Sequence, residues 1–116
     1  MIALLLMAAI SRCAVATLCP SNADLASAIY DRGEEAAVAW MIAEQARDPS
    51  VYPLAHAVLV RRIGDVHCGA AEPGAVASVM CSFTALVGRR TLYEVAQLEH
   101  REDKWVIVKN MFVERE

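Results

Sequence analysis

Four cysteines are the side chains of this 116-residue sequence with the most chemical potential, and their spacing restricts what they can do. They are Cys13, Cys19, Cys68 and Cys81. No two of them have the C-x-x-C spacing of a zinc ribbon or a thioredoxin-like site, so both are disfavoured. Disulfide bonding in an oxidising compartment suits them better.

Cys68 and Cys81 are predicted to form a disulfide bond across a β-hairpin. Cys68 ends a predicted strand over residues 63–68, and Cys81 lies within a second one over 77–86. Residues 69–74 between them are rich in turn formers. Closing a loop of this size stabilises the fold by about 3 kcal/mol in the chain-entropy description. The alternative is a pair of buried free thiols in a reducing cytosol.

The N-terminus resembles a secretory leader. Residues 2–10 are continuously apolar but too short to span a bilayer. Ala14-Val15-Ala16 has the small-x-small pattern that predicts cleavage after Ala16. No basic residue precedes the apolar run, and Arg12 follows it, so a buried N-terminal helix and a lipidated cysteine remain open alternatives.

Cleavage there divides the chain into a signal peptide (1–16), an N-terminal segment with a short helix (17–33) and one domain (34–116). Cys13 would leave with the leader, and Cys19 would be left without a partner. Cleavage further along, or a bond between chains, are the alternatives for Cys19. The sequence therefore predicts an exported protein, periplasmic or extracellular, with no stable transmembrane span after processing.

The first half of the domain is expected to be helical. Ser21 or Asn22 could cap a short helix over 23–30, which Gly33 would end, and a stronger helix is expected over Glu34–Arg47. Apolar residues recur on that second helix at helical spacing, which predicts that they face the core. The residues expected there are Val38, Met41, Ile42 and Gln45, with Ala37 and Trp40 beside them.

The second half alternates with period two, as strands with one buried face do. Strands are expected over 63–68, 77–86, 91–99 and 105–112, joined by short polar turns. Short connections favour an antiparallel meander. The predicted fold class is α+β, with the N-terminal helix or helices packed on a four-stranded antiparallel sheet. Glu94 and Glu99 are expected to point outward and to form cross-strand ion pairs.

This order resembles the cystatin-like and nuclear-transport-factor-like superfold, as found in small exported bacterial proteins. The likeness rests on the helix Glu34–Arg47, on the cysteine hairpin, and on the Trp-led strand that begins Asp103-Lys104-Trp105-Val106-Ile107. The hairpin part is Val66-His67-Cys68 with Val79-Met80-Cys81-Ser82-Phe83. The Gln-x-Val-x-Gly and Pro-Trp motifs of cystatins are absent, so inhibition of cysteine proteases is not expected.

Composition and motifs disfavour several functions. The net charge is -3 and basic residues do not cluster, which disfavours nucleic-acid binding. His56, His67 and His100 have no partner at catalytic or metal-ligand spacing, so no catalytic, metal or cofactor site is predicted.

The expected function is a non-catalytic binding or interaction module of the cell envelope, with another envelope protein as its partner. One alternative is a small-cavity hydratase or isomerase that uses His56 or His67 with Asp65 or Glu94. Another is a structural accessory protein that acts as an oligomer. The sequence leaves the oligomeric state open.

Overall fold

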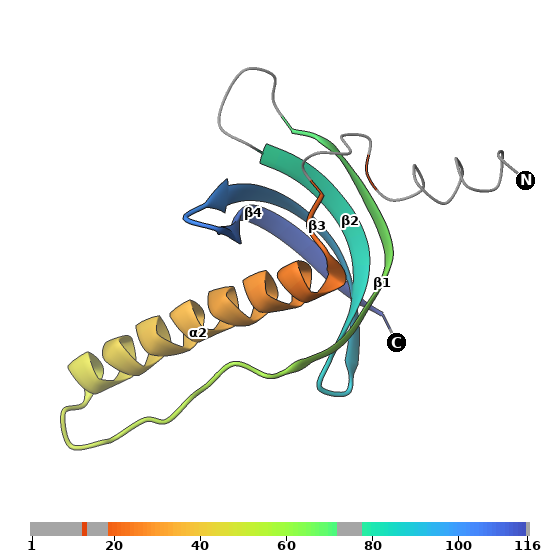
Figure 1. The fold of residues 1–116 in the computed structure, drawn as a ribbon. Coiled ribbons are helices and arrows are strands. Elements are labelled where there is room, and N and C mark those ends of the chain that lie inside the picture. The colour runs from red at the N-terminus through yellow and green to blue at the C-terminus, as the bar shows by residue number, and fades with distance from the viewer. Residues whose placement is uncertain (1–12, 14–18, 72–77, 116) are drawn as a thin grey trace, which may run out of the picture.

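The computed structural model describes residues 13, 19–71 and 78–115, and it shows an α+β fold. One helix, α2, is followed by four strands in a single antiparallel sheet of order β1-β2-β3-β4 (Figure 1). The predicted fold class is therefore confirmed. Residues 1–12 and 14–18, which hold most of the predicted signal peptide, lie outside the described residues. The elements are α2 (Asn22–Arg47), β1 (Val60–Ala70), β2 (Ser78–Val87), β3 (Arg90–Arg101) and β4 (Lys104–Arg115).

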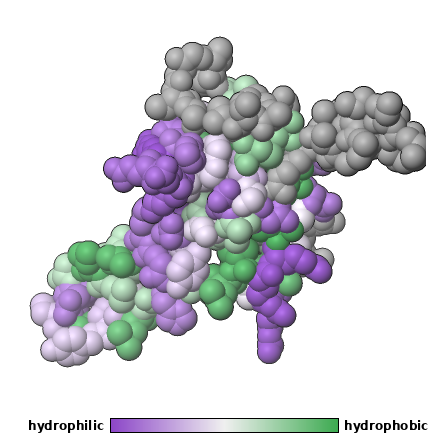
Figure 2. All heavy atoms as spheres, viewed as in Figure 1, coloured by the Kyte–Doolittle hydropathy of each residue, from purple (hydrophilic) through white to green (hydrophobic). Residues whose placement is uncertain are grey.

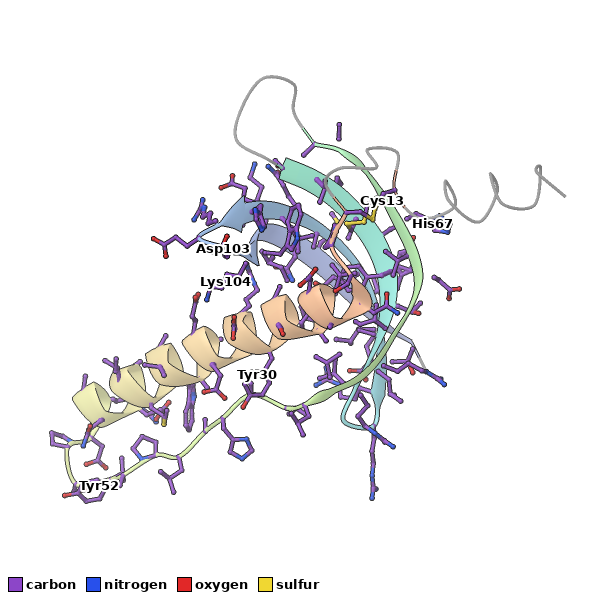
Figure 3. All side chains as sticks on the ribbon, in the orientation of Figure 1. Cys13, Tyr30, Tyr52, His67, Asp103 and Lys104 are labelled. Carbon is purple, nitrogen blue, oxygen red and sulfur yellow. A yellow bond between two sulfur atoms is a disulfide. The ribbon has the colours of Figure 1, made fainter. Side chains whose placement is uncertain are left out.

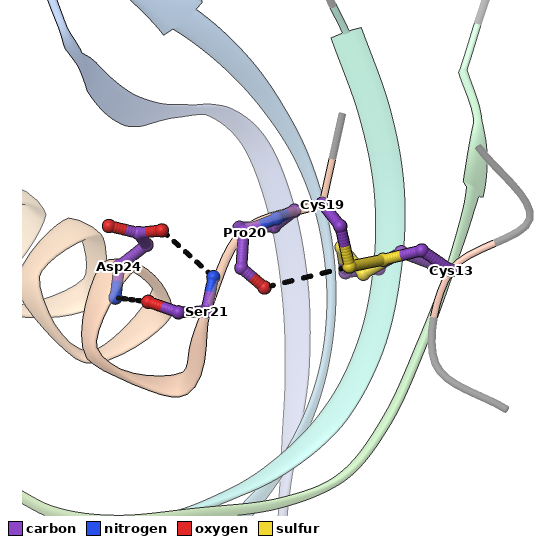
Figure 4. The surroundings of a disulfide bond; sticks show 7 residues. Cys13, Cys19, Pro20, Ser21 and Asp24 are labelled. Atoms are coloured by element: carbon purple, nitrogen blue, oxygen red, sulfur yellow. Dashed lines mark hydrogen bonds between the residues drawn. A yellow bond between two sulfur atoms is a disulfide. The ribbon is translucent and has the colours of Figure 1, made fainter. Parts of the chain in front are cut away.

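Helix α2 is continuous over 26 residues, so the break predicted at Gly33 is wrong. Ser21 caps its first turn, because its hydroxyl accepts from the Asp24 backbone N–H while the Asp24 carboxylate accepts from the Ser21 N–H (Figure 4). The helix ends at Arg47, where a cation suits the negative end of the helix dipole. One glycine costs a helix only about 1 kcal/mol, which a long capped helix tolerates.

Two tight turns connect the last three strands. Gly88 has a φ of 61°, which suits the first central position of a two-residue hairpin turn. Glu102 and Asp103 have φ of 49° and 64°, as both central residues of a type I′ turn must have. These turns set the register in which Phe83 faces Glu94 and Glu94 faces Phe112.

The core lies between the concave face of the sheet and the first half of α2. Alternate residues of β2 and β3 point inward, as period two predicts. Leu25 and Ala28 cover them from the helix. The main buried side chains of the sheet are Ile63, Cys68, Val79, Cys81, Phe83, Ala85, Ala96, Leu98, Trp105 and Ile107.

Only the first half of α2 lies on the sheet. The Asn22 side chain donates to the carbonyl of Ile63 on β1 at 3.4 Å, and Arg32 donates to the carbonyl of Ile107 on β4 at 3.3 Å. Ten residues of helix cover about 15 Å, which matches three strand spacings of about 4.8 Å each. The helix thus crosses the sheet from one edge strand to the other by residue 32, and the remaining fifteen residues extend about 22 Å further.

The rest of α2 and the segment after it form a lobe, residues 33–59, that projects beyond the sheet (Figure 1). Its extended part, residues 48–59, runs back along the helix and rejoins the sheet at β1. The core position predicted for the helix stripe is therefore wrong. Val38, Trp40 and Ile42 are 46%, 48% and 65% exposed, because no sheet lies beneath them, whereas Ala37 is buried.

Candidate functional site

The sheet holds the predicted hairpin disulfide. Cys68 and Cys81 are cross-strand partners on β1 and β2, with Cα atoms 4.1 Å apart, and they are bonded to each other. Both lie in the hydrophobic core. Of the segment 69–74 predicted as a turn, residues 69 and 70 belong to β1, and residues 72–74 lie outside the described residues.

A second disulfide bonds Cys13 to Cys19, a pairing that the predicted cleavage after Ala16 would remove. Cys13 is 8% exposed and forms a parallel bridge with Cys68, which places the two disulfides next to each other (Figure 4). The sequence contains a signal for this bond, because the two cysteines are only six residues apart. The predicted cleavage site after Ala16 lies between them, so the signal-peptide prediction and the disulfide exclude each other.

The candidate catalytic histidines do not join a common site. His67 lies on β1 and points away from the sheet on its outer side (Figure 3), whereas Glu94 points to the concave face. His56 lies in the lobe, exposed, with Nδ1 3.1 Å from the carbonyl oxygen of Ala57. His100 is exposed at the end of β3 and lies beside Trp105, with ring centroids 5.0 Å apart and ring planes tilted by 52°.

Asp65, the other candidate acid, belongs to an irregular position of β1. It has a φ of 53° at a shift of the β1–β2 register. Its carboxylate accepts from the Thr84 hydroxyl at 3.4 Å. The contact is local to the β1–β2 pair, and Asp65 serves to shape the strand.

Glu94 is the buried acid among the described residues, at 3% exposure, and the prediction that it points outward is wrong. Strand alternation explains the result, because residue 94 shares a face with Leu92 and Ala96, which are both buried. Phe83 and Phe112 are its direct cross-strand neighbours. One carboxylate oxygen, Oε2, has no hydrogen-bond partner among the described residues.

The surroundings of Glu94 raise its pKa above the ordinary value for a glutamate. Burial is the largest cause, since it disfavours the charged form. A hydrogen bond with the Asn110 side chain and the charge of Arg32 act in the opposite direction. Arg32 and Asn110 also line a groove of about 530 Å³ along β4, together with apolar side chains that include Val108 and Met111.

The projecting lobe carries eight of the thirteen exposed large apolar residues of the described chain. Apolar side chains gather over it in Figure 2, and a groove of about 250 Å³ lies between its helix and its extended segment. From residue 36 to 59 the only charged residues are Glu44, Arg47 and Asp48, and the first two form an ion pair. The exposed large apolar residues of the lobe are Val38, Trp40, Ile42, Val51, Tyr52, Leu54, Val58 and Leu59.

Specific contacts hold the lobe together. Glu34 accepts a hydrogen bond from the backbone N–H of Ala57 at 2.9 Å. Gly33 lets the two segments approach closely, since a Cβ there would lie 3.0 Å from the Cβ of Ala57. The N–H of Gly88 donates to the carbonyl of Leu59 at 3.1 Å and ties the segment to the sheet. The lobe is therefore a built element, with its apolar side chains arranged on both of its segments.

Two further findings concern the described residues alone. They contain no group of three or more histidine, cysteine, aspartate or glutamate side chains that could hold a metal ion. None of their helices is long and apolar enough to cross a membrane.

Comparison of the chain with protein-family models, with curated proteins and with solved structures finds no match in any of the three.

Proposed function

We propose that this chain is an exported, non-catalytic interaction module that binds a protein partner through its projecting lobe. The observation that carries the proposal is the lobe itself: it has eight exposed large apolar residues, against five charged residues in 33–59. Contiguous apolar patches of more than a few hundred Å² are rare on monomeric proteins and mark interaction sites.

The construction of the lobe supports binding. The Glu34–Ala57 hydrogen bond and the Gly88–Leu59 tie arrange the apolar side chains before a partner arrives. A surface that is already ordered loses less conformational entropy on association. Trp40 and Tyr52 are side chains of the kind that contribute most to binding energy at interfaces.

Two disulfides support a periplasmic or extracellular location, because such bonds persist in oxidising compartments. These two bonds cross-link the part of the protein from which the lobe projects. The apolar residues 2–10 are in keeping with export. The enzyme alternative has less support, since His67 and Glu94 lie on opposite faces of the sheet.

Site-specific photo-cross-linking in the native host tests the proposal. A photo-reactive amino acid replaces Ile42 in the lobe, and a matched variant carries it at His67, which is exposed on the outer side of β1. Adducts of defined mass are expected from position 42 and not from position 67. The absence of adducts at position 42, or the same adducts at both positions, would contradict the proposal.

A further inference from the structure

We infer that the partner of the lobe is a second copy of this chain, in a two-fold dimer that pairs β4 with β4 and places each lobe over the other copy's sheet. This inference rests on the proposed function, because it names the occupant of the same surface. Three features carry it: the length of α2, the edge of β4, and the exposed apolar side chain of Phe112 on the concave face.

The length of α2 exceeds the width of its own sheet. The helix passes β4 at Asp31 and Arg32, which contact Lys104 (3.6 Å) and Ile107 (3.3 Å). About 22 Å of helix then remains, enough to cross four more strand spacings of about 4.8 Å. A second four-stranded sheet that continues this one past β4 would therefore lie under the lobe.

The edge of β4 is suited to such a continuation. β4 has twelve residues and pairs only with β3 among the described strands. Arg32 binds the carbonyl of Ile107, so the part of the β4 edge that can pair is the part beyond Ile107. Natural edge strands are usually short, charged or covered, because a long apolar edge recruits another strand. Here Met111, Phe112 and Val113 are 70%, 55% and 68% exposed.

Antiparallel pairing of two identical edges requires a two-fold axis normal to the sheet, so that residues of the same face oppose each other. With Asn110 on the axis, Lys109 of each copy lies opposite Met111 of the other. This register keeps the lysines from facing each other, which like charges disfavour. The regular pairing spans residues 109–111 on both sides of the axis and ends at the β4 irregularity next to Ile107. The helix that passes over Ile107 then continues toward the Phe112 end of the other sheet.

That end of the concave face is the part that α2 leaves open. Phe112 lies there beside buried Glu94, on the face that points toward the helix. The lobe presents Ala39 and Ala43 to the same side, in line with Leu25 and Ala28 about three to five turns earlier. Small side chains let a helix pack closely on a sheet, and Trp40 flanks them.

The available area is sufficient for a dimer. The exposed apolar side chains of the lobe and of β4 offer an area on the order of 1,000 Å² per copy, whereas a stable interface needs about 800 Å² per partner. Two strands that pair along β4 add main-chain hydrogen bonds to this area.

Light scattering on the oxidised full chain over a dilution series tests the inference. The expected mass is twice 12.6 kDa. Met111→Lys, which sets lysines opposite Lys109 on both sides of the axis, and Ala43→Arg, which places a charge between lobe and sheet, are each expected to raise the dimer dissociation constant at least about 30-fold. Both positions are exposed in the single chain, so circular dichroism should show unchanged folding.

Matched controls lie outside the lobe and outside the edge of β4. Ser27→Arg changes an exposed position on the first half of α2, and Tyr93→Lys changes an exposed position on β3, inside the sheet. Both are expected to leave the dissociation constant within about twofold of the unmodified chain, since surface changes outside an interface have small effects. A dimer that survives Met111→Lys and Ala43→Arg as well as the controls would overturn the inference.

The cross-linking experiment separates this inference from the proposed function. Adducts from position 42 with twice the mass of the chain support both. A monomeric chain whose adducts have another mass overturns the dimer and leaves the interaction module standing. A monomeric chain without adducts overturns both.

Discussion

Glu94→Gln is expected to stabilise the protein at neutral and alkaline pH and to leave it unchanged in acid. Glu94 is 3% exposed, and its Oε2 lacks a hydrogen-bond partner among the described residues. Burial raises its pKa, so the folded protein holds a proton on this group at pH values where the unfolded chain has lost it. An amide of the same size is neutral at every pH and can keep the contact with Asn110.

The sign of the pH dependence follows from proton linkage. Stability falls with rising pH wherever the folded state binds more protons than the unfolded state. The stabilising contribution of the protonated Glu94 is therefore complete below the ordinary glutamate pKa and is lost as the pH rises through the raised pKa. The difference in the free energy of unfolding between the Glu94→Gln variant and the unmodified chain should be near zero at low pH. It should grow across this pH window to a plateau.

Each pH unit by which burial raises the pKa of Glu94 adds about 1.4 kcal/mol to the plateau. For a domain of this size, 1 kcal/mol shifts the unfolding midpoint by about 4–8 °C. Thermal unfolding followed by circular dichroism between pH 4 and pH 9 measures the difference. Glu114→Gln serves as the control, since Glu114 is half-exposed and ion-paired with Arg90 and should lose at most about 1 kcal/mol. A Glu94→Gln variant that is less stable than the unmodified chain at pH 8 would refute the reasoning.

Three further predictions concern the covalent frame and one turn. Replacing Cys68 and Cys81 together by alanine should lower the free energy of unfolding by about 3 kcal/mol in urea titrations, and a loss below about 1 kcal/mol would contradict the role given to this bond. The intact mass of the protein from its native host should include Cys13 and lack four hydrogens, because Cys13 is buried and disulfide-bonded; a chain that begins at Thr17 would contradict this. Gly88→Ala should cost about 1–2 kcal/mol or more, since its φ is 61° and an added Cβ would lie 2.9 Å from Val58 Cγ1; unchanged urea unfolding would argue against this turn geometry.

The sheet could be predicted from the sequence because its signals are local. Alternation of apolar and polar residues marks β2 and β3, and turn residues such as Gly88 mark their ends. Each observed strand extends its predicted range by one to three residues at one or both ends. Glu94 could also have been placed correctly, since alternation assigns it to the buried face with Leu92 and Ala96.

The position of the helix could not be predicted in the same way. The apolar stripe of Val38, Met41 and Ile42 shows one face of a helix, but not whether a sheet lies beneath that face. The answer depends on the width of the sheet and on the point at which α2 crosses β4, both of which are non-local. The same stripe that predicts a core in the sequence is a binding surface in the proposal.

The functional inference from sequence was limited for a related reason. The interaction surface has no catalytic or ligand motif, and it consists of ordinary core-type residues left uncovered. The cystatin-like resemblance rests on the order of elements and stays a prediction. The Cys13–Cys19 bond shows that a processing pattern and a disulfide pattern can compete for the same residues.

Acrylamide quenching of Trp40 tests most directly whether a partner covers the lobe. Trp40 is 48% exposed and Trp105 is 8% exposed, so a Trp105→Phe variant reports on the lobe alone. Covering of the lobe predicts that quenching falls about twofold or more as the protein concentration rises through the dimer range, and that Met111→Lys prevents the fall. Quenching of Trp40 that is equal at every concentration, both in the protein with Met111 and in the Met111→Lys variant, would contradict the account.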